Sequence, residues 1–442
     1  MASAASHVMS RPSSAGVYAW YVAALLATGH LVSFVDRFVM SLVMEPLKAD
    51  LGVSDAQLGL LQGTGFVILY TAVAIPLGLM ADRVNRRNLI IAGILLWSIA
   101  TAACGLATSF GSLFLARIGV GFGEAALVPS AMSLLASLFP RRQLGRAVSL
   151  FTAGASLGKS AALIGGGTVL ALLVASGGLH LGAHTFKPWQ GTFIIMALPG
   201  LVLAALLLTV REPERAASTV ARPNLATALA TLRANRLAYG LHTAAAALVV
   251  LEIQGLAAWA VSFFVRYYAM TPAQSGVTVG TIILFAAPLG HLAGGLLTDL
   301  FQKRGTRAPA APVIALGLVC VIPAALLFTQ ARSLPVALTG YGLLNFFGTM
   351  SAPASLAGVQ MLTSERLRGV ITSMFLAVTT FVGVGLGPAL IGLASDSIGG
   401  AEGLRAALTL IMPTVAVLGI ALALVSRAPF ARTAQAVLAP QS

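Results

Sequence analysis

Long apolar stretches separated by short polar turns run along almost the whole chain. We predict about twelve segments of at least roughly 18 apolar residues, the length that an α-helix needs to cross the ~30 Å hydrocarbon core of a bilayer. They lack the strict alternation of barrel strands and are rich in Ala, Leu and Gly, which predicts helices. The fold class is therefore an all-α membrane protein with twelve transmembrane helices. The expected segments are 17–43, 57–81, 89–107, 112–138, 146–176, 190–210, 238–268, 273–300, 312–330, 335–362, 367–395 and 403–427.

Composition supports this reading and excludes most soluble functions. Hydrophobic residues make up 58% of the 442 residues and charged residues only 9%, and the mean hydropathy is +0.92. Soluble domains carry roughly 25% charged residues, so this chain cannot cover a soluble fold with a charged surface. A soluble enzyme or a nucleic-acid-binding protein is therefore not expected, although the net charge is +14.

The basic residues are distributed asymmetrically between the loops. If both termini lie on one side of the membrane, 19 of the 27 Lys and Arg residues fall on that side, five fall on the other and three fall inside segments. Cytoplasmic loops are enriched in Lys and Arg, so both termini are predicted to be cytoplasmic. The positive charge then needs no nucleic-acid partner, because loop positions and anionic lipid headgroups explain it.

The chain contains an internal repeat with an offset of 217 residues. Ser54–Gly59 (SDAQLG) resembles Thr271–Gly276 (TPAQSG), and Gly78–Asp82 (GLMAD) resembles Gly295–Asp299 (GLLTD) in the same register. We therefore predict two six-helix bundles related by a pseudo-two-fold axis. Their expected limits are 1–210 and 237–442, joined by a cytoplasmic linker at 211–236 that contains charges and two prolines.

Two parallel halves of six helices are the plan of the major facilitator superfamily, in which the substrate site lies between the halves near the midplane. The stretch that begins at Gly78 resembles the signature of this superfamily in the loop after the second helix, with an imperfect second copy. The resemblance implies a cytoplasmic gate in which an aspartate sits near a helix N-terminus of the opposite half, where the helix dipole favours a carboxylate. The gate residues would be Gly78, Asp82, Arg83, Arg86, Arg87, Asp299, Lys303 and Arg304.

Three further motifs are similar to the spinster-like branch of that superfamily. They are Phe34–Arg37 (FVDR), Arg117–Ala125 (RIGVGFGEA) and Trp259–Tyr268 (WAVSFFVRYY). The resemblance implies transport of lysophospholipids, sphingoid phosphates or related amphiphiles. Substrate identity is the part of the resemblance that the motifs specify least.

Charged residues inside the predicted helices are the candidate working groups, since a charge at the membrane centre costs ~2.5–3.5 kcal/mol on insertion scales and normally has a partner. Asp36 and Arg37 are expected at a depth between Arg117 and Glu124, which share one face of an antiparallel helix. Gly119, Gly121 and Gly123 would permit close helix approach. We expect a network that couples proton binding to alternating access, with Glu124 the better candidate for the proton site; a static charge cluster is the alternative.

The substrate-binding candidates span both halves. Lys159 replaces a proline that many facilitators have after the preceding glycine, and we expect it to contact an anionic substrate or a carboxylate. Glu252 lies one position short of the repeat counterpart of Asp36 and is a candidate second acid facing Lys159. The full set is Arg37, Lys159, Glu252, Gln254, Trp259, Tyr341 and Asn345, with Phe263, Phe264, Phe346 and Phe347 expected in an aromatic wall. Three histidines, His30, His242 and His291, are each expected to bond a hydroxyl or carbonyl.

These features favour a secondary active, proton-coupled transporter of an amphipathic lipid-like or organic-anion substrate. Uptake of a small carboxylate or multidrug efflux remains an alternative, although three buried bases argue against cationic drugs. A membrane-embedded lipid-modifying enzyme is disfavoured because the sequence offers no nucleophile–base pair, metal-ligand cluster or phosphate loop. We expect no cofactor, no metal and a monomer in the lipid bilayer. The Arg- and Ala-rich composition suggests a bacterial inner membrane.

Overall fold

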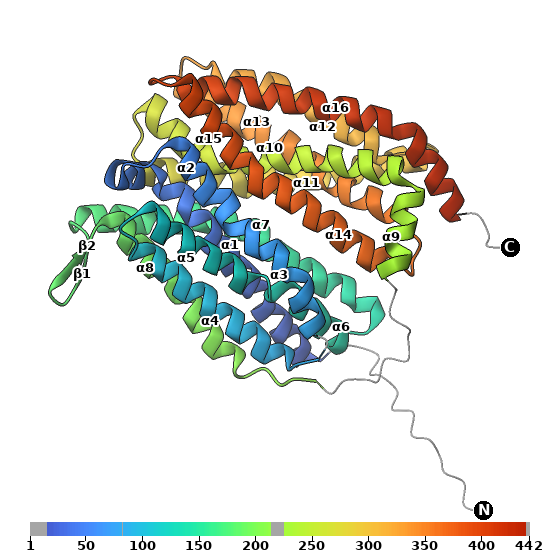
Figure 1. The fold of residues 1–442 in the computed structure, drawn as a ribbon, viewed down its shortest axis with the longest axis horizontal. Helices are drawn as coiled ribbons and strands as arrows, with labels where there is room; N and C mark the ends of the chain where they lie inside the picture. The colour runs from blue at the N-terminus through green and yellow to red at the C-terminus, as the bar shows by residue number, and fades with distance from the viewer. Residues whose placement is uncertain (1–15, 82, 214–224, 439–442) are drawn as a thin grey trace, which may run out of the picture.

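The computed structural model describes residues 16–81, 83–213 and 225–438. It is almost entirely helical. Its two halves lie side by side, and their long helices run in roughly the same direction (Figure 1). The start of α1, the end of α16 and the short helix α9 lie at one end, which we name the linker end. The hairpin formed by β1 and β2 lies at the opposite end, which we name the hairpin end (Figure 1).

The first half contains six membrane-length helical segments, two of them built from several elements. An antiparallel hairpin that the sequence pattern did not predict joins its fifth and sixth segments. The elements are α1 (Val17–Leu51), α2 (Asp55–Gly59), the π-helix η1 (Leu60–Thr64), α3 (Gly65–Ala81), α4 (Arg86–Gly105), α5 (Phe110–Glu124), α6 (Leu127–Leu138), α7 (Arg141–Ala175), β1 (Leu179–Leu181), β2 (His184–Phe186) and α8 (Pro188–Leu207).

The second half repeats this order of long segments after α9 (Leu225–Ala234), which was also not predicted. Its eleventh segment overall is divided by a second π-helix, η2, as the second segment is divided by η1. The elements are α10 (Arg236–Tyr268), α11 (Pro272–Lys303), α12 (Ala310–Thr329), α13 (Leu334–Met361), α14 (Arg368–Thr380), η2 (Phe381–Leu386), α15 (Gly387–Ile398) and α16 (Gly403–Leu438).

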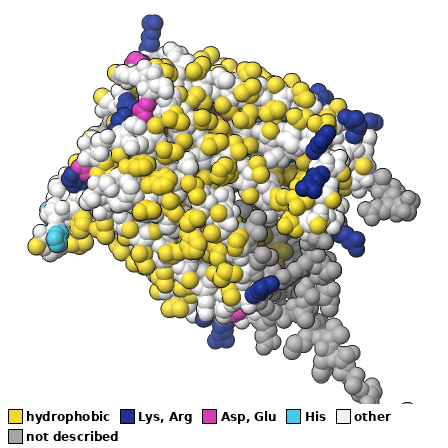
Figure 2. All heavy atoms as spheres, viewed as in Figure 1, with side chains coloured by type: hydrophobic (Ala, Val, Ile, Leu, Met, Phe, Trp, Pro, Cys, Tyr) yellow, Lys and Arg dark blue, Asp and Glu magenta, His cyan; other side chains and the backbone are white. Residues whose placement is uncertain are grey.

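Eleven helical segments of the described chain are long and apolar enough to cross a membrane. The twelfth predicted segment is the 28-residue α13. It has sufficient length, but its glycines, hydroxyl side chains and Asn345 lower its hydropathy. The visible face of the molecule is largely apolar, and Lys and Arg side chains gather towards its two ends (Figure 2). This is the surface of a multi-pass membrane protein, confirming the predicted fold class.

The repeat has a local structural cause. Ser54 and Thr271 each occupy the N-cap of a helix, and each forms a capping box with the glutamine three residues later, Gln57 or Gln274. A capping box satisfies two otherwise unpaired backbone N–H groups, so the same residue types begin the second segment of both halves.

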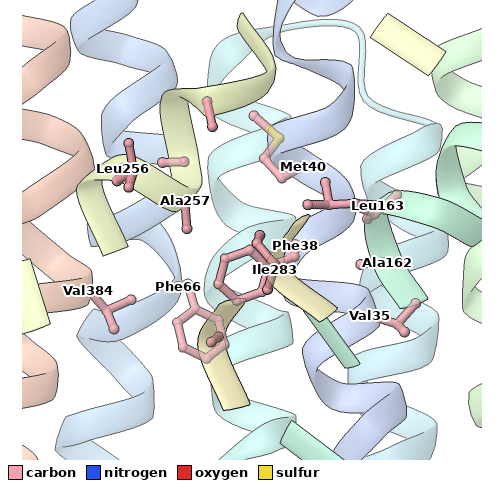
Figure 3. Close-up of a cluster of buried hydrophobic side chains, with 14 of the residues drawn as sticks. Val35, Phe38, Met40, Phe66, Ala162, Leu163, Leu256, Ala257, Ile283 and Val384 are labelled. Carbon is pink, nitrogen blue, oxygen red and sulfur yellow. The ribbon is translucent and has the colours of Figure 1, made fainter. Parts of the chain in front are cut away.

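The halves meet most closely near the hairpin end. A Cβ atom added to Gly59 would lie 2.4 Å from the Pro388 carbonyl oxygen, and one added to Gly63 would lie 2.3 Å from that of Val384. Only glycine allows this approach of α2 and η1 to η2 and α15. Apolar side chains from both halves continue the contact inward, where Phe38, Phe66, Leu256 and Ile283 belong to one buried cluster (Figure 3).

Candidate functional site

The structure brings the four predicted charged residues of the first half together. Arg37 on α1 donates to Glu124 Oε2 at the end of α5 over 2.5 Å, and both side chains are buried. The Arg37 guanidinium also lies 4.1 Å from the centre of the Phe66 ring and 4.6 Å from that of Phe34. A buried cation is thus held by one carboxylate and two aromatic faces.

Arg117 and Asp36 do not form a second ion pair beside Arg37 and Glu124. Arg117 is fully buried and donates to three backbone carbonyls, those of Leu61, Asp36 and Arg37, at 3.2–3.4 Å. Both carboxylate oxygens of Asp36 are buried without a hydrogen-bond partner. Arg117 therefore ties α5 to the backbones of α1 and η1. Asp36 has no ion-pair partner among the described residues, and the Trp97 and Thr101 side chains are its neighbouring donors.

Glycines in α5 allow this cluster to form. A Cβ at Gly121 would meet the Phe66 carbonyl at 2.0 Å, and a Cβ at Gly123 would meet the Gly93 carbonyl at 2.7 Å. Helix α5 can therefore lie against α3 and α4 at backbone distance, which places Arg117 and Glu124 beside α1. A Cβ at Gly119 would be 3.1 Å from Ala100, a milder contact. The predicted role of these glycines in helix packing agrees with this geometry.

Lys159 joins the two halves near the middle of the molecule. Its ammonium group on α7 donates to Gln254 Oε1 on α10 over 2.9 Å and lies 4.8 Å from the centre of the Phe38 ring. The bond partner is neutral, so Lys159 keeps an uncompensated positive charge beside the Arg37–Glu124 pair. Lys159 thus pairs with a neutral amide of the second half and not with a carboxylate in this conformation, whereas its expected contact with an anionic substrate stays a prediction.

Glu252 does not face Lys159, which corrects a second expectation. It lines a small cavity within the second half together with Asn345 and Thr349. Gln254, two positions along the helix from Glu252, points instead to Lys159, because two residues turn an α-helix by about 200°. Both carboxylate oxygens of Glu252 are buried and unpartnered.

The predicted aromatic wall is also placed differently. Trp259 is fully buried and donates its indole N–H to the Pro388 carbonyl at 2.9 Å, so it packs α10 against α15. Tyr341 and Phe264 stack edge-to-face at 5.9 Å inside the second half, and Phe263 lies in the same aromatic cluster. These rings stabilise helix packing. Large aromatic side chains can line a substrate cavity or pack in a core, so their sequence pattern does not distinguish between these two roles.

The remaining aromatic pair and the histidines have local partners. Phe346 and Phe347 are half-buried and contact each other edge-to-face, with ring centres 5.1 Å apart. His30, His242 and His291 each bond one backbone carbonyl, of Phe151, Ser355 and Ala287 respectively, at 2.8–3.0 Å. The expected carbonyl partner is confirmed for each histidine.

The predicted gate residues at the linker end do not bridge the halves in this conformation. Arg86 is buried and donates to Glu212 Oε1 over 2.6 Å, and Arg87 donates to the Val210 carbonyl over 3.0 Å. Both arginines therefore hold the segment that follows α8. The predicted gate residues of the second half, Asp299, Lys303 and Arg304, are exposed and form no ion pair with a described residue. Arg83 is exposed and Gly78 is half-buried, whereas Asp82 lies outside the described residues.

An ionic network at the hairpin end, which the sequence analysis missed, closes that side instead. Arg266 on α10 donates two hydrogen bonds to the Asp55 carboxylate, at 2.6 and 2.7 Å, and a third to Glu45 at 2.9 Å. Lys48 also contacts Asp55 at 2.5 Å. Because Glu45, Lys48 and Asp55 lie in the first half, Arg266 ties it to the second.

Asp396 completes this network from the second half. Its carboxylate accepts the backbone N–H groups of Asp55 and Ala56, at 3.0 and 2.7 Å, at the N-terminus of the helix that begins with α2. The neighbouring Ser395 hydroxyl donates to Asp55 over 2.6 Å. A carboxylate at a helix N-terminus of the opposite half is the arrangement that the sequence predicted for the linker end.

Between described residues, every hydrogen bond that links the halves lies at the hairpin end or in the middle. They join Glu45, Asp55, Ala56, Thr64 and Lys159 in the first half to partners in the second half. The signal that could have found this network is the set of charges at the ends of the apolar segments, at 45–55, 266 and 396, at a similar depth in both halves.

Comparison with known proteins agrees with this geometry. The family described as Major Facilitator Superfamily matches residues 26–388. An MFS-type efflux pump of Mycolicibacterium smegmatis is 30% identical over 91% of both chains, and Protein spinster of Drosophila melanogaster is 28% identical over 72% of this chain and 51% of its own.

A solved structure gives the same result for the fold. The crystal structure of a bacterial homologue of the human lysosomal transporter Spinster, described as inward-facing and unoccupied, superposes with a TM-score of 0.80 at 25% identity. It covers 96% of this chain and 98% of its own. This chain therefore belongs to the major facilitator superfamily of membrane transporters and to its spinster-like branch.

Proposed function

We propose that this transporter moves an amphipathic or organic-anion substrate in exchange for, or together with, protons. The observation that carries the proposal is the contact between Lys159 and Gln254, which places an uncompensated cation between the halves and next to the buried Arg37–Glu124 pair. A cation beside apolar and aromatic surface suits an amphiphile with an anionic head. We place the linker end, and thus both termini, on the cytoplasmic side of a bacterial inner membrane.

Proton coupling follows from the Arg37–Glu124 pair. A proton on Glu124 removes the negative partner of Arg37, so the guanidinium keeps only its aromatic contacts. Arg37 then gains by turning to a substrate anion or to another acid, and Asp36 is the nearest acid on the same helix. An anion bound to Lys159 in turn breaks its bond to Gln254 and loosens the contact between the halves. Proton and substrate thereby act on the same equilibrium between conformations.

We further propose that the conformation described here opens at the linker end. The Arg266–Asp55 and Asp396 contacts join the halves at the hairpin end, whereas Arg86 and Arg87 at the linker end bond within the first half. In the opposite conformation, Asp82 and Asp299 with their neighbouring basic residues would take over the closing role. The similar crystal structure is described as inward-facing, which supports this direction.

Transport in proteoliposomes tests the substrate class. We expect a fluorescent lysophosphatidylglycerol to accumulate or be released in response to an imposed pH gradient, and Lys159→Gln to reduce the rate by at least about tenfold. Lys187→Gln is the matched control, because Lys187 pairs with Asp50 within the first half at the hairpin end. Equal rates for wild type and Lys159→Gln would contradict the role of this cation.

Efflux of drugs and uptake of small carboxylates are tested in the same vesicles. Relatives named MFS-type efflux pump and Probable L-galactonate transporter, the latter from Escherichia coli at 26% identity over 41% of this chain, keep both classes open. Ethidium and galactonate are the probes. Gradient-driven movement of ethidium that survives Lys159→Gln would favour cationic drug efflux, and movement of galactonate without lysolipid would favour carboxylate uptake.

The pH dependence tests the proton site separately. We expect Glu124→Gln to flatten the dependence of lysolipid transport on the pH gradient, because the side chain no longer binds a proton. Asp36→Asn is expected to have a smaller effect of the same kind. Transport that stays equally pH-sensitive in both variants would show that protons bind elsewhere.

A further inference from the structure

Glu252 is a buried acid of the second half, and the mechanism proposed above assigns no role to it. It lies on α10, its exposed fraction is 2%, and neither carboxylate oxygen has a hydrogen-bond partner. An ionised carboxylate buried in this way is unstable unless a cation or several donors accompany it. The groups around Glu252 therefore determine whether its carboxylate is paired with a cation or carries a proton.

The cavity beside Glu252 is polar on one side and very small. The volume that the centre of a water molecule can occupy in this cavity is about 10 Å³, so the cavity holds about one water molecule. Asn345 on α13 uses its amide N–H for the Tyr341 carbonyl at 3.0 Å, so its amide oxygen is the group left to accept a bond. The Thr349 hydroxyl donates to the Asn345 carbonyl at 2.6 Å.

Among the described residues, Glu252 is the one charged side chain that lines this cavity. Its remaining walls are glycine and apolar side chains from α10, α12, α13 and α16: Ile253, Leu256, Val321, Leu344, Gly348 and Met412. Tyr341, one turn from Asn345, is the neighbouring titratable group, and its buried hydroxyl lies beside the Asn345 side chain. Lys159 contacts the other face of α10 through Gln254. Glu252 therefore has no cationic side chain beside it in this cavity, and a proton on its carboxylate would remove the unpaired charge.

The position matches the proton-binding cluster of the first half. Helices α10 and α13 are the first and fourth membrane helices of the second half, as α1 and α5 are of the first. In the first half the acids lie with Arg37 and Arg117, whereas in the second half the corresponding interior holds an acid and neutral polar groups. The two halves thus place an acid at similar depth, but two arginines accompany the acids of the first half, whereas the lining of the second-half cavity contains no described basic residue.

We propose that Glu252, Asn345 and Thr349 form a second proton-binding site, in which Glu252 carries an exchangeable proton as a carboxylic acid and shares it with Asn345 and one water molecule. This site does not require the first-half cluster to bind protons. It gives the transporter a proton that resides in the second half, on the helix whose Gln254 contacts Lys159.

Infrared spectroscopy of the purified protein tests the site without a substrate. Wild type at pH 7 should show a carbonyl stretch of a protonated carboxylic acid that is missing in Glu252→Gln and that shifts after equilibration in D₂O. Asn345→Leu should keep this band at a higher frequency, because the acceptor is lost. Glu402→Gln, at an exposed glutamate, is the control and should leave the band unchanged. Glu252→Gln mimics the protonated acid, so its melting temperature should equal or exceed that of wild type.

Three results would overturn the proposal. Identical carbonyl bands in wild type and Glu252→Gln would show that Glu252 is ionised. A band that never shifts in D₂O would show a proton that does not exchange. Stabilisation by Na⁺ of wild type but not of Glu252→Gln would assign a metal cation to the site. A failure of the first-half mechanism would instead appear in Glu124→Gln, which leaves the Glu252 band unaffected.

Discussion

At the residue scale, the Arg37–Glu124 pair shows why a buried ion pair adds little net stability although the loss of either member is costly. Two buried charges lose most of their hydration, and their attraction repays this loss only while both are present. Arg37 has one carboxylate partner and an Nε atom without any partner. The pair therefore contributes little net stability, but each member needs the other or a substitute such as a substrate anion.

Removing only the acid should therefore be costly. We expect Glu124→Ala to lower the free energy of unfolding by about 3–5 kcal/mol, because Arg37 is left buried and unpaired. The double variant Arg37→Met/Glu124→Leu should recover most of that loss. Thermal unfolding in detergent measures both. Glu402→Ala, which breaks the exposed pair with Arg405, should change stability by less than about 1 kcal/mol. A double variant no more stable than Glu124→Ala would contradict this account.

At the element scale, the N-terminus of the α2 segment acts as the contact between the halves at the hairpin end. Asp396 accepts two backbone N–H groups there, and Arg266 holds Asp55 from the same side. Helix N-termini carry partial positive charge and free donors, so a carboxylate from the opposite half binds well and can also leave without unfolding either half.

Asp396→Asn should weaken this contact and shift the protein toward a state that is open at the hairpin end. We expect labelling of a cysteine placed at Thr64, which bonds the Gly385 carbonyl across the halves, to become about tenfold faster, equivalent to about 1.4 kcal/mol. Asp50→Asn is the matched control, since Asp50 bonds Lys187 and Trp189 within one half. Equal acceleration by both variants would mean general loosening.

The glycines at the interface give an independent test of the same element. Gly63→Ala inserts a methyl group where the Val384 carbonyl lies at 2.3 Å, so we expect it to push the halves apart and also to accelerate labelling at Thr64→Cys. Gly154→Ala meets the Ala27 carbonyl at 2.2 Å within one half and should lower the melting temperature instead. At Gly295 there is open space, and alanine should be neutral. Similar behaviour of all three variants would contradict the distinction.

Sequence patterns predicted the long helices and the first-half cluster because both depend on local rules. Helix length and apolar composition follow the thickness of the bilayer, and buried charges in antiparallel helices meet where their depths match. The pairing of Lys159 with Gln254, the inward turn of Glu252 and the packing role of Trp259 depend on helix rotation, which a uniformly apolar helix does not reveal. The Arg266–Asp55–Asp396 network joins residues up to 341 positions apart in sequence, and only the packed halves show it.

At the scale of the whole molecule, sidedness links the charge pattern to the mechanism. The linker end holds the start of α1, α9 and the end of α16, and basic side chains gather there in Figure 2. The hairpin end holds β1, β2 and the closed network. If the linker end is cytoplasmic, then the Arg266–Asp55 contact lies on the outer side, and in the proposed mechanism a proton entering from outside must wait until this contact opens.

Cysteine labelling in intact cells tests this sidedness. In a variant without Cys104 and Cys320, a cysteine at exposed Ala183 in the hairpin should react with a membrane-impermeant maleimide, whereas a cysteine at exposed Gln302 should react only after permeabilisation. The reason is that 19 of 27 basic residues favour the cytoplasmic side for the loops at the linker end. The opposite labelling pattern would reverse the direction of every proposed step, because the closed network would then face the cytoplasm and the open end would face outward. The buried clusters and their tests would remain as described, since neither the Arg37–Glu124 pair nor the Glu252 cavity depends on which side the hairpin faces.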